Sequence, residues 1–133
     1  MDQVRPGLIG VVGVCASGKT TLVNGLKALG YQARNIPQEH SVVPGLWRRY
    51  QPEFLVMLDA TLPTIRARRP VAWGEERLAE QRQRLASARS HCHLYLPTDG
   101  LSIDEVREAV GEAFHRFREQ EVDYEGHPER GQA

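Results

Sequence analysis

Residues 13–20 read Gly-Val-Cys-Ala-Ser-Gly-Lys-Thr, and the rest of the chain is organised around them. An apolar run, residues 8–12, precedes this stretch, and a helical pattern, residues 21–29, follows it. The spacing G-x-x-x-x-G-K-[ST] between a buried strand and a helix is typical of a loop whose backbone N–H groups surround a phosphate. The alternative is a glycine-rich turn that binds no ligand. The context favours the phosphate-binding loop.

The residues of this loop have separate predicted roles. Gly13 and Gly18 allow a backbone conformation that side chains disfavour, and they let the main chain approach the ligand closely. Lys19 places a point charge on the outer phosphates, and Thr20 offers its hydroxyl to Mg²⁺. The other positions expected to contact the nucleotide are Cys15, Ala16, Ser17 and Thr21.

Length and composition favour one ordinary globular domain. The chain has 133 residues, of which 41% are hydrophobic and 26% charged, and its 17 basic residues balance its 17 acidic ones. A zero formal charge gives no overall attraction to nucleic acid or to an anionic membrane. No apolar run approaches the ~20 residues that cross a bilayer, and no leader pattern is evident. We therefore expect a cytoplasmic protein, with Cys15 and Cys92 as free thiols.

A short alternating run, residues 31–36, predicts a second strand that Pro37 ends. The following residues, 38–52, are polar and interrupted by prolines, so we expect them to form a loop outside the core. In parallel sheets, the loops at the carboxyl ends of the strands form the ligand crevice. Glu39 and His40 are therefore expected near the phosphate-binding loop.

A continuous apolar run, residues 54–59, ends in Asp59 and has the pattern of a strand buried on both faces. A carboxylate at that end of the strand can hold a water bound to Mg²⁺ beside the loop. Asp59 can equally cap the segment that follows or accept hydrogen bonds from loop backbone. The sequence does not decide between these two roles.

Two charged helices are predicted next, over residues 61–69 and about 74–90. Arginines close to a phosphate loop can stabilise a phosphoryl group during transfer. Arg66 and Arg69, nearest the strand end, are the best candidates. For most of the other arginines, a solvated helix with Glu–Arg pairs is the better explanation.

The C-terminal part predicts one more strand and one more helix. The strand covers residues 92–96, where His91 and His93 lack a third nearby metal ligand. Ser102 and Glu105 form a capping box that opens a helix running to about Arg118. From residue 119 to residue 133 the chain is polar, and we expect a disordered tail. One domain, residues 1–118, is predicted.

Together these motifs resemble the nucleoside and nucleotide kinases among the P-loop NTPases, a group that includes the thymidylate, adenylate and deoxynucleoside kinases. The similarity covers most of residues 8–118 and is carried by the loop, the run 52–59, the arginine-rich helix and the segment 94–106. It implies a three-layer α/β/α P-loop NTPase fold with a small parallel sheet of about four strands. It also implies ATP and Mg²⁺ as ligands and a lid of arginines.

The resemblance has two further features. Deoxynucleoside kinases place a catalytic Glu at the end of their second strand and a Trp some residues later, and Glu39 with Trp47 is similar in placement. The kinases usually have a further strand, helices and an acceptor-binding segment between the second strand and the apolar run ending in Asp. Here only residues 38–52 fill that interval.

Three functions are consistent with the sequence. The first is a small kinase that transfers the γ-phosphoryl group of Mg-ATP to a nucleoside, a nucleotide or another small acceptor. In this kinase, Glu39 or His40 would serve as the base. The positive charges that would stabilise the transferring group are those of Lys19, Arg66 and Arg69. The second is a regulatory protein that binds or slowly hydrolyses NTP without an acceptor. The third is a P-loop protein that binds a nucleotide for stability alone and can form a homodimer. In that case Trp47 and Trp73 would lie in an interface or in the core.

Overall fold

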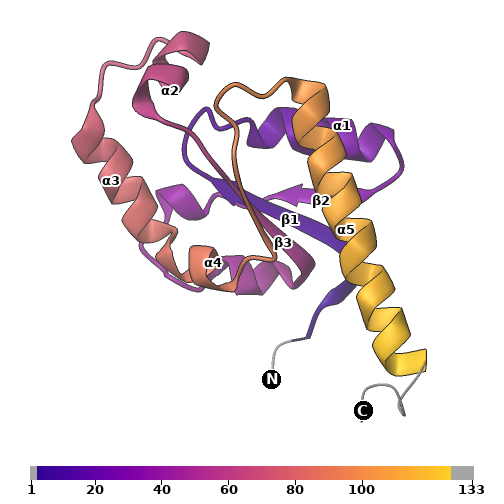
Figure 1. Ribbon diagram of the computed structural model, residues 1–133. Coiled ribbons are helices and arrows are strands. Elements are labelled where there is room, and N and C mark those ends of the chain that lie inside the picture. Colours follow the sequence, from indigo (N-terminus) through magenta and orange to yellow (C-terminus); the bar gives the residue numbers. More distant parts are fainter. Residues whose placement is uncertain (1–2, 127–133) are drawn as a thin grey trace.

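The computed structural model of the protein describes residues 3–126 and has an α/β architecture with one four-stranded sheet (Figure 1). The sheet has the order β2-β1-β3-β4, and all of its strands are parallel. The strands are β1 (Arg5–Gly13), β2 (Gln32–Asn35), β3 (Pro52–Asp59) and β4 (Leu94–Pro97). The predicted parallel sheet of about four strands is confirmed.

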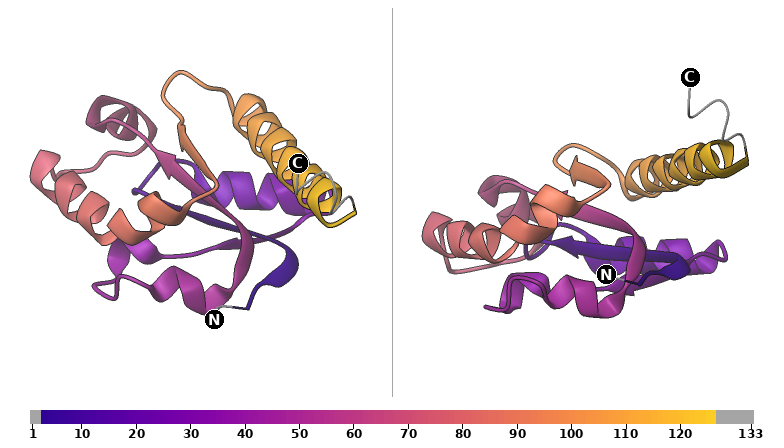
Figure 2. Two further views of the ribbon diagram at one scale, coloured as in Figure 1. Left: turned by 60° about the horizontal axis from the view of Figure 1, so that its bottom comes forward. Right: turned by 90° about the horizontal axis from the view of Figure 1, so that it is seen from below.

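Helices cover both faces of the sheet, as two further views also show (Figure 2). One face carries α1 (Lys19–Ala28) and α5 (Ile103–Gly126), which contact each other. The other face carries α2 (Leu62–Arg68), α3 (Glu75–Arg84), α4 (Ala86–His91) and the short 3₁₀ helices η1 (Gln38–His40) and η2 (Leu46–Tyr50).

The central strands bury both of their faces, which explains their continuous apolar sequences. In β3, Phe54, Val56 and Leu58 pack under α1 and α5. Leu55 and Met57 alternate with them and pack on the opposite face against α2, α3 and α4. Because β1 and β3 are parallel neighbours, their carboxyl ends lie side by side at one edge of the sheet, where the loop of residues 13–20 begins.

Three expectations about the helices need correction. Residues 38–52 do not lie outside the core, because Gln38, Glu39 and Trp47 are buried in η1 and η2. The predicted helix over 74–90 is two helices that meet at Leu85, whose side chain is fully buried. The last helix, predicted to end at about Arg118, passes through Gly111 and continues to Gly126 in α5. The rest of the predicted tail, residues 127–133, lies outside the described residues.

No helix in the part of the chain that the structure describes combines the length and apolar character needed to span a membrane.

Candidate functional site

The loop of residues 13–20, hereafter the glycine loop, connects β1 to α1 with a backbone that needs both of its glycines. A Cβ at position 13 would lie 2.5 Å from the carbonyl oxygen of Leu58 and 2.7 Å from Oγ of Ser17. Gly18 precedes α1 with a φ of 107°, in the left-handed region where side chains are strained. Ala16 is left-handed too, with a φ of 59°, although it carries a side chain. The glycine positions predicted from the motif thus have a clear steric basis.

Lys19 lies in the first turn of α1 and curls back over the loop. Its Nζ donates to the carbonyl oxygens of Gly13 and Val14 at 2.9 and 3.1 Å. The same Nζ lies 2.8 Å from Oε2 of Glu39, although Lys19 and Glu39 are only 8% and 3% exposed. A buried ammonium is stable only with such partners. The sequence prediction that Glu39 lies near the loop is therefore met by a direct contact.

Glu39 retains unused capacity for a ligand. Its Oε2 bonds Lys19 and lies 3.5 Å from Nε2 of His40, whose side chain is exposed. Its Oε1 is buried and has no hydrogen-bond partner among the described residues. Arg84 of α3 donates to the Glu39 backbone carbonyl at 3.3 Å and so helps to position η1. A buried carboxylate oxygen without a partner is costly, and this cost is repaid if a ligand or ion occupies the site.

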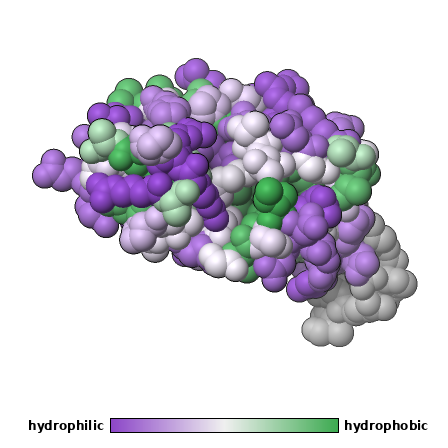
Figure 3. Space-filling view, turned by 90° about the horizontal axis from the view of Figure 1, so that it is seen from above, coloured by the Kyte–Doolittle hydropathy of each residue, from purple (hydrophilic) through white to green (hydrophobic). Residues whose placement is uncertain are grey.

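A cavity of about 690 Å³ opens above the glycine loop. Figure 3 shows this face of the molecule, where hydrophilic side chains border a central group of hydrophobic and neutral ones. Within the described residues, Glu39 is the one carboxylate that lines the cavity. The lining includes, from the loop, Cys15, Ala16, Ser17, Gly18, Lys19, Thr20 and Thr21, and from elsewhere Asn35, His40, Arg68, Arg69, Thr98, Leu101, Ile103 and Val106. The volume falls in the range of small-molecule sites, about 300–1,000 Å³.

The structure separates the two predicted arginines. Arg69 lines the cavity, whereas Arg66 donates to the carbonyl oxygen of Trp73 at 3.1 Å and does not line it. Arg68, which was not singled out from the sequence, donates to the carbonyl of Ala16 at 2.9 Å and to that of Thr98 at 2.9 Å. Arg68 and Arg69 thus both line the cavity, and Arg68 also holds the glycine loop, which charge density alone does not reveal.

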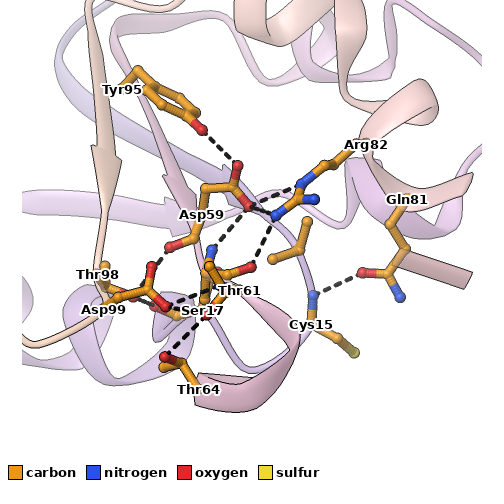
Figure 4. Close-up of polar contacts among 12 residues, drawn as sticks. Cys15, Ser17, Asp59, Thr61, Thr64, Gln81, Arg82, Tyr95, Thr98 and Asp99 are labelled. Carbon is orange, nitrogen blue, oxygen red and sulfur yellow. Dashed lines mark hydrogen bonds and ion pairs between the residues drawn. The ribbon is translucent and has the colours of Figure 1, made fainter. Parts of the chain in front are cut away.

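The carboxylate of Asp59, a predicted metal ligand, is surrounded by other groups of the chain (Figure 4). Its Oδ1 accepts from Arg82 at 3.1 Å and from the Ala60 N–H at 2.8 Å, and its Oδ2 accepts from the Tyr95 hydroxyl. Burial, followed by the hydrogen bond to Asp59, raises the pKa of Tyr95 above its usual value. Asp59 does not line the cavity. Of the two roles left open by the sequence, the structure shows hydrogen bonding to neighbouring groups.

The side of the glycine loop near Asp59 is held by α3 and by the segment after β4 (Figure 4). The Cys15 N–H donates to Oε1 of Gln81, which is 2% exposed. The buried Thr98 hydroxyl donates to the carbonyl oxygen of Ser17 at 2.9 Å. Sequence reasoning missed Gln81 and Thr98. A signal for Gln81 was present in its position: it lies three residues after Leu78 and four before Leu85, so it falls on the apolar stripe that the helical spacing predicts to be buried.

Asp99 joins that segment to the start of α2. Its Oδ1 accepts from the backbone N–H of Thr61 at 2.9 Å and from the Thr61 hydroxyl at 2.7 Å. Burial acts to raise the pKa of Asp99, but hydrogen bonds from Thr64 and Thr61 outweigh it and lower the pKa to about 2. Asp99 therefore fixes Thr61, the residue that precedes α2, to the segment after β4.

Thr20 lies at the open end of the loop, where its Oγ1 accepts from Nδ2 of Asn35 at 3.1 Å. Within the described residues, no group of three or more His, Cys, Asp or Glu side chains forms a ready metal site. A cation here would therefore depend on oxygens supplied by a ligand in addition to those of the chain.

Compared with known proteins, the chain matches no family model, and no curated sequence is significantly similar to it.

Proposed function

We propose that the glycine loop binds the triphosphate of a nucleotide, with ATP as the expected donor, and that the protein is a small Mg-ATP-dependent kinase. The observation that carries this proposal is Lys19, a buried ammonium that lines the cavity and lies beside a glycine-rich turn opening a helix. A helix N-terminus with a lysine attracts anions, and a polyphosphate satisfies both. The sequence motif and the contacts of the loop support the same ligand.

The residues at the cavity fit a magnesium ion when Glu39 is used in place of Asp59. The two carboxylate oxygens of Asp59 are already bonded to Arg82, Ala60 and Tyr95. Glu39 has a buried oxygen with no partner in residues 3–126, and Thr20 has a hydroxyl at the same cavity. Hard oxygen ligands of this kind suit Mg²⁺, which when bound would neutralise charge on the phosphates.

The same cavity supplies groups for phosphoryl transfer to a small acceptor. Glu39 and His40 are the two bases beside Lys19, and one of them takes the proton of an acceptor hydroxyl. Arg69 lines the cavity and provides positive charge for the transferring group, whereas Arg66 is bonded elsewhere. Leu101, Ile103 and Val106 provide apolar surface at the cavity that suits a nucleotide base.

Transfer of label from [γ-³²P]ATP tests this function, with nucleosides, nucleotides and small hydroxylated metabolites as acceptors. We expect at least one acceptor to be labelled by the wild type, with a loss of about 100-fold or more in Lys19→Ala. His40→Ala then shows whether His40 is the base, since Glu39→Gln also removes the proposed ligand of the cation. Slow loss of ATP with every acceptor left unlabelled would favour a regulatory NTPase instead. No loss of ATP under any condition would contradict both.

A further inference from the structure

Glu39 has a feature that the kinase chemistry does not explain. A base needs to reach an acceptor, but Oε2 of this carboxylate is committed to Lys19 at 2.8 Å. Lys19 is the side chain that the phosphates need. In the ligand-free protein its ammonium is shared between Glu39 and the carbonyl oxygens of Gly13 and Val14. Any polyphosphate that binds the glycine loop must therefore displace or accommodate a buried carboxylate.

This arrangement is unfavourable for a bare polyphosphate. Phosphate oxygens that approach Lys19 also approach Glu39. The phosphates and the Glu39 carboxylate are both negatively charged and repel each other. The 3% exposure of Glu39 leaves little water to screen their repulsion. Nε2 of the nearby His40 lies 3.5 Å from Oε2 of Glu39, but this side chain is 61% exposed to water and does not replace Lys19 as a buried partner of the carboxylate. For a polyphosphate without a bound metal ion, repulsion by Glu39 thus offsets much of the attraction of Lys19.

A divalent cation that arrives with the phosphates reverses this balance. Oε1 of Glu39 is buried, has no partner among the described residues and belongs to a side chain that lines the cavity. It can bind a cation that the phosphates also bind, directly or through a coordinated water. The chain alone offers too few ligands for a stable metal site in its described part, so the cation and the phosphates are expected to bind together.

We propose that Glu39 makes the glycine loop selective for metal-bound polyphosphate: its Oε2 holds Lys19 in the ligand-free protein, and its free Oε1 accepts the divalent cation that accompanies the phosphates. This inference rests on the proposed triphosphate site and adds a rule for which form of the ligand enters it. Thr20 is the second contact of the cation. Asp59, bonded to Arg82, has no part in the selection.

Binding measurements without turnover test the proposal. Isothermal titration calorimetry with ATP and with inorganic triphosphate is run in excess Mg²⁺ and in EDTA. For the wild type we expect binding in EDTA to be weaker by on the order of 100-fold. For Glu39→Gln we expect the difference to fall below about 5-fold, mainly because metal-free binding becomes tighter. Glu108→Gln, at an exposed glutamate of α5 that does not line the cavity, should behave as the wild type.

The outcomes separate this inference from the proposed function. Equal wild-type affinity in Mg²⁺ and in EDTA would overturn the selection by Glu39 and leave triphosphate binding intact. A Glu39→Gln protein with an unchanged Mg²⁺ dependence would overturn it as well. No binding in either condition would contradict both proposals. If Glu39→Gln does not fold, Glu39→Asp, which keeps the charge, must retain the Mg²⁺ dependence, and its loss would count against the proposal.

Discussion

Glu39 and Asp59 are two buried carboxylates at the same edge of one sheet, and their surroundings make them different. Asp59 is bonded on both oxygens, to Arg82, Ala60 and Tyr95, and joins β3 to α3 and β4. Glu39 is bonded through one oxygen to Lys19, and its other oxygen has no partner in the described structure. A filled set of hydrogen bonds favours a structural role for Asp59. The open oxygen of Glu39 supports its role in the proposed ligand site.

The largest expected effect on stability is at Asp59. In Asp59→Asn, one carboxylate oxygen becomes an NH₂ group that can only donate, so Arg82 or the half-buried Tyr95 hydroxyl loses its acceptor. We expect the free energy of unfolding to fall by about 2 kcal/mol. Urea denaturation followed by circular dichroism measures the change. A loss within about 0.5 kcal/mol, the range of ordinary surface substitutions, would contradict the structural assignment of this acid.

The contact between Gln81 and the loop should give the next effect. Gln81→Leu keeps the volume but leaves the Cys15 N–H without its acceptor. We expect a loss of about 1–2 kcal/mol in stability, and weaker binding of Mg-ATP because the loop is no longer held. Gln83→Leu, at an exposed position of the same helix, is the matched control. Equal affinity for Mg-ATP in the two variants would show that Gln81 supports the fold alone.

The lowered pKa of Asp99 predicts how the free energy of unfolding depends on pH. Its pKa in the folded protein is about 2, below the ordinary 3.8, so its contribution is present above about pH 4 and is lost as the pH falls toward 2. Because Asp99 is partly exposed, we expect a loss of about 1 kcal/mol at most. Urea midpoints at about pH 5, 4 and 3 for the wild type and Asp99→Asn test this. Parallel pH curves for the two proteins would exclude the role given to Asp99.

The smallest change in stability is expected for Glu39→Gln. The amide oxygen can still accept from Lys19, whose ammonium also keeps its bonds to the carbonyl oxygens of Gly13 and Val14 and lines a cavity that water can enter. Because the ammonium stays hydrogen-bonded and hydrated, we expect the free energy of unfolding to change by less than about 1 kcal/mol. The same urea experiment used for Asp59→Asn gives the comparison directly. A Glu39 variant as destabilised as the Asp59 variant would remove the distinction between the two acids.

Local sequence signals were sufficient to predict much of this fold. The strands and the first and last helices follow from apolar runs, glycines and a capping box, each read within a few residues. Ser102 and Glu105 do form reciprocal hydrogen bonds at the start of α5. The position of Glu39 beside the glycine loop also followed from a local rule, since a residue soon after a parallel strand lies at its carboxyl end.

What the sequence missed depends on contacts between distant segments. Asp59 meets Arg82 and Tyr95, and Cys15 meets Gln81 across 66 positions of the chain. No spacing rule connects such residues, because packing of α3 on the sheet brings them together. The burial of Trp47, which the sequence left open between an interface and the core, also involves a distant segment, since its indole N–H donates to Ser87, 40 positions later.

The central claim is that the glycine loop and Lys19 bind a nucleoside triphosphate. Calorimetry of Mg-ATP with the wild type and with Lys19→Ala tests it most directly. We predict saturable binding by the wild type and affinity lower by about 100-fold or more in the variant. Absence of binding by the folded wild type to Mg-ATP and Mg-GTP, or equal affinity in the two proteins, would contradict the account.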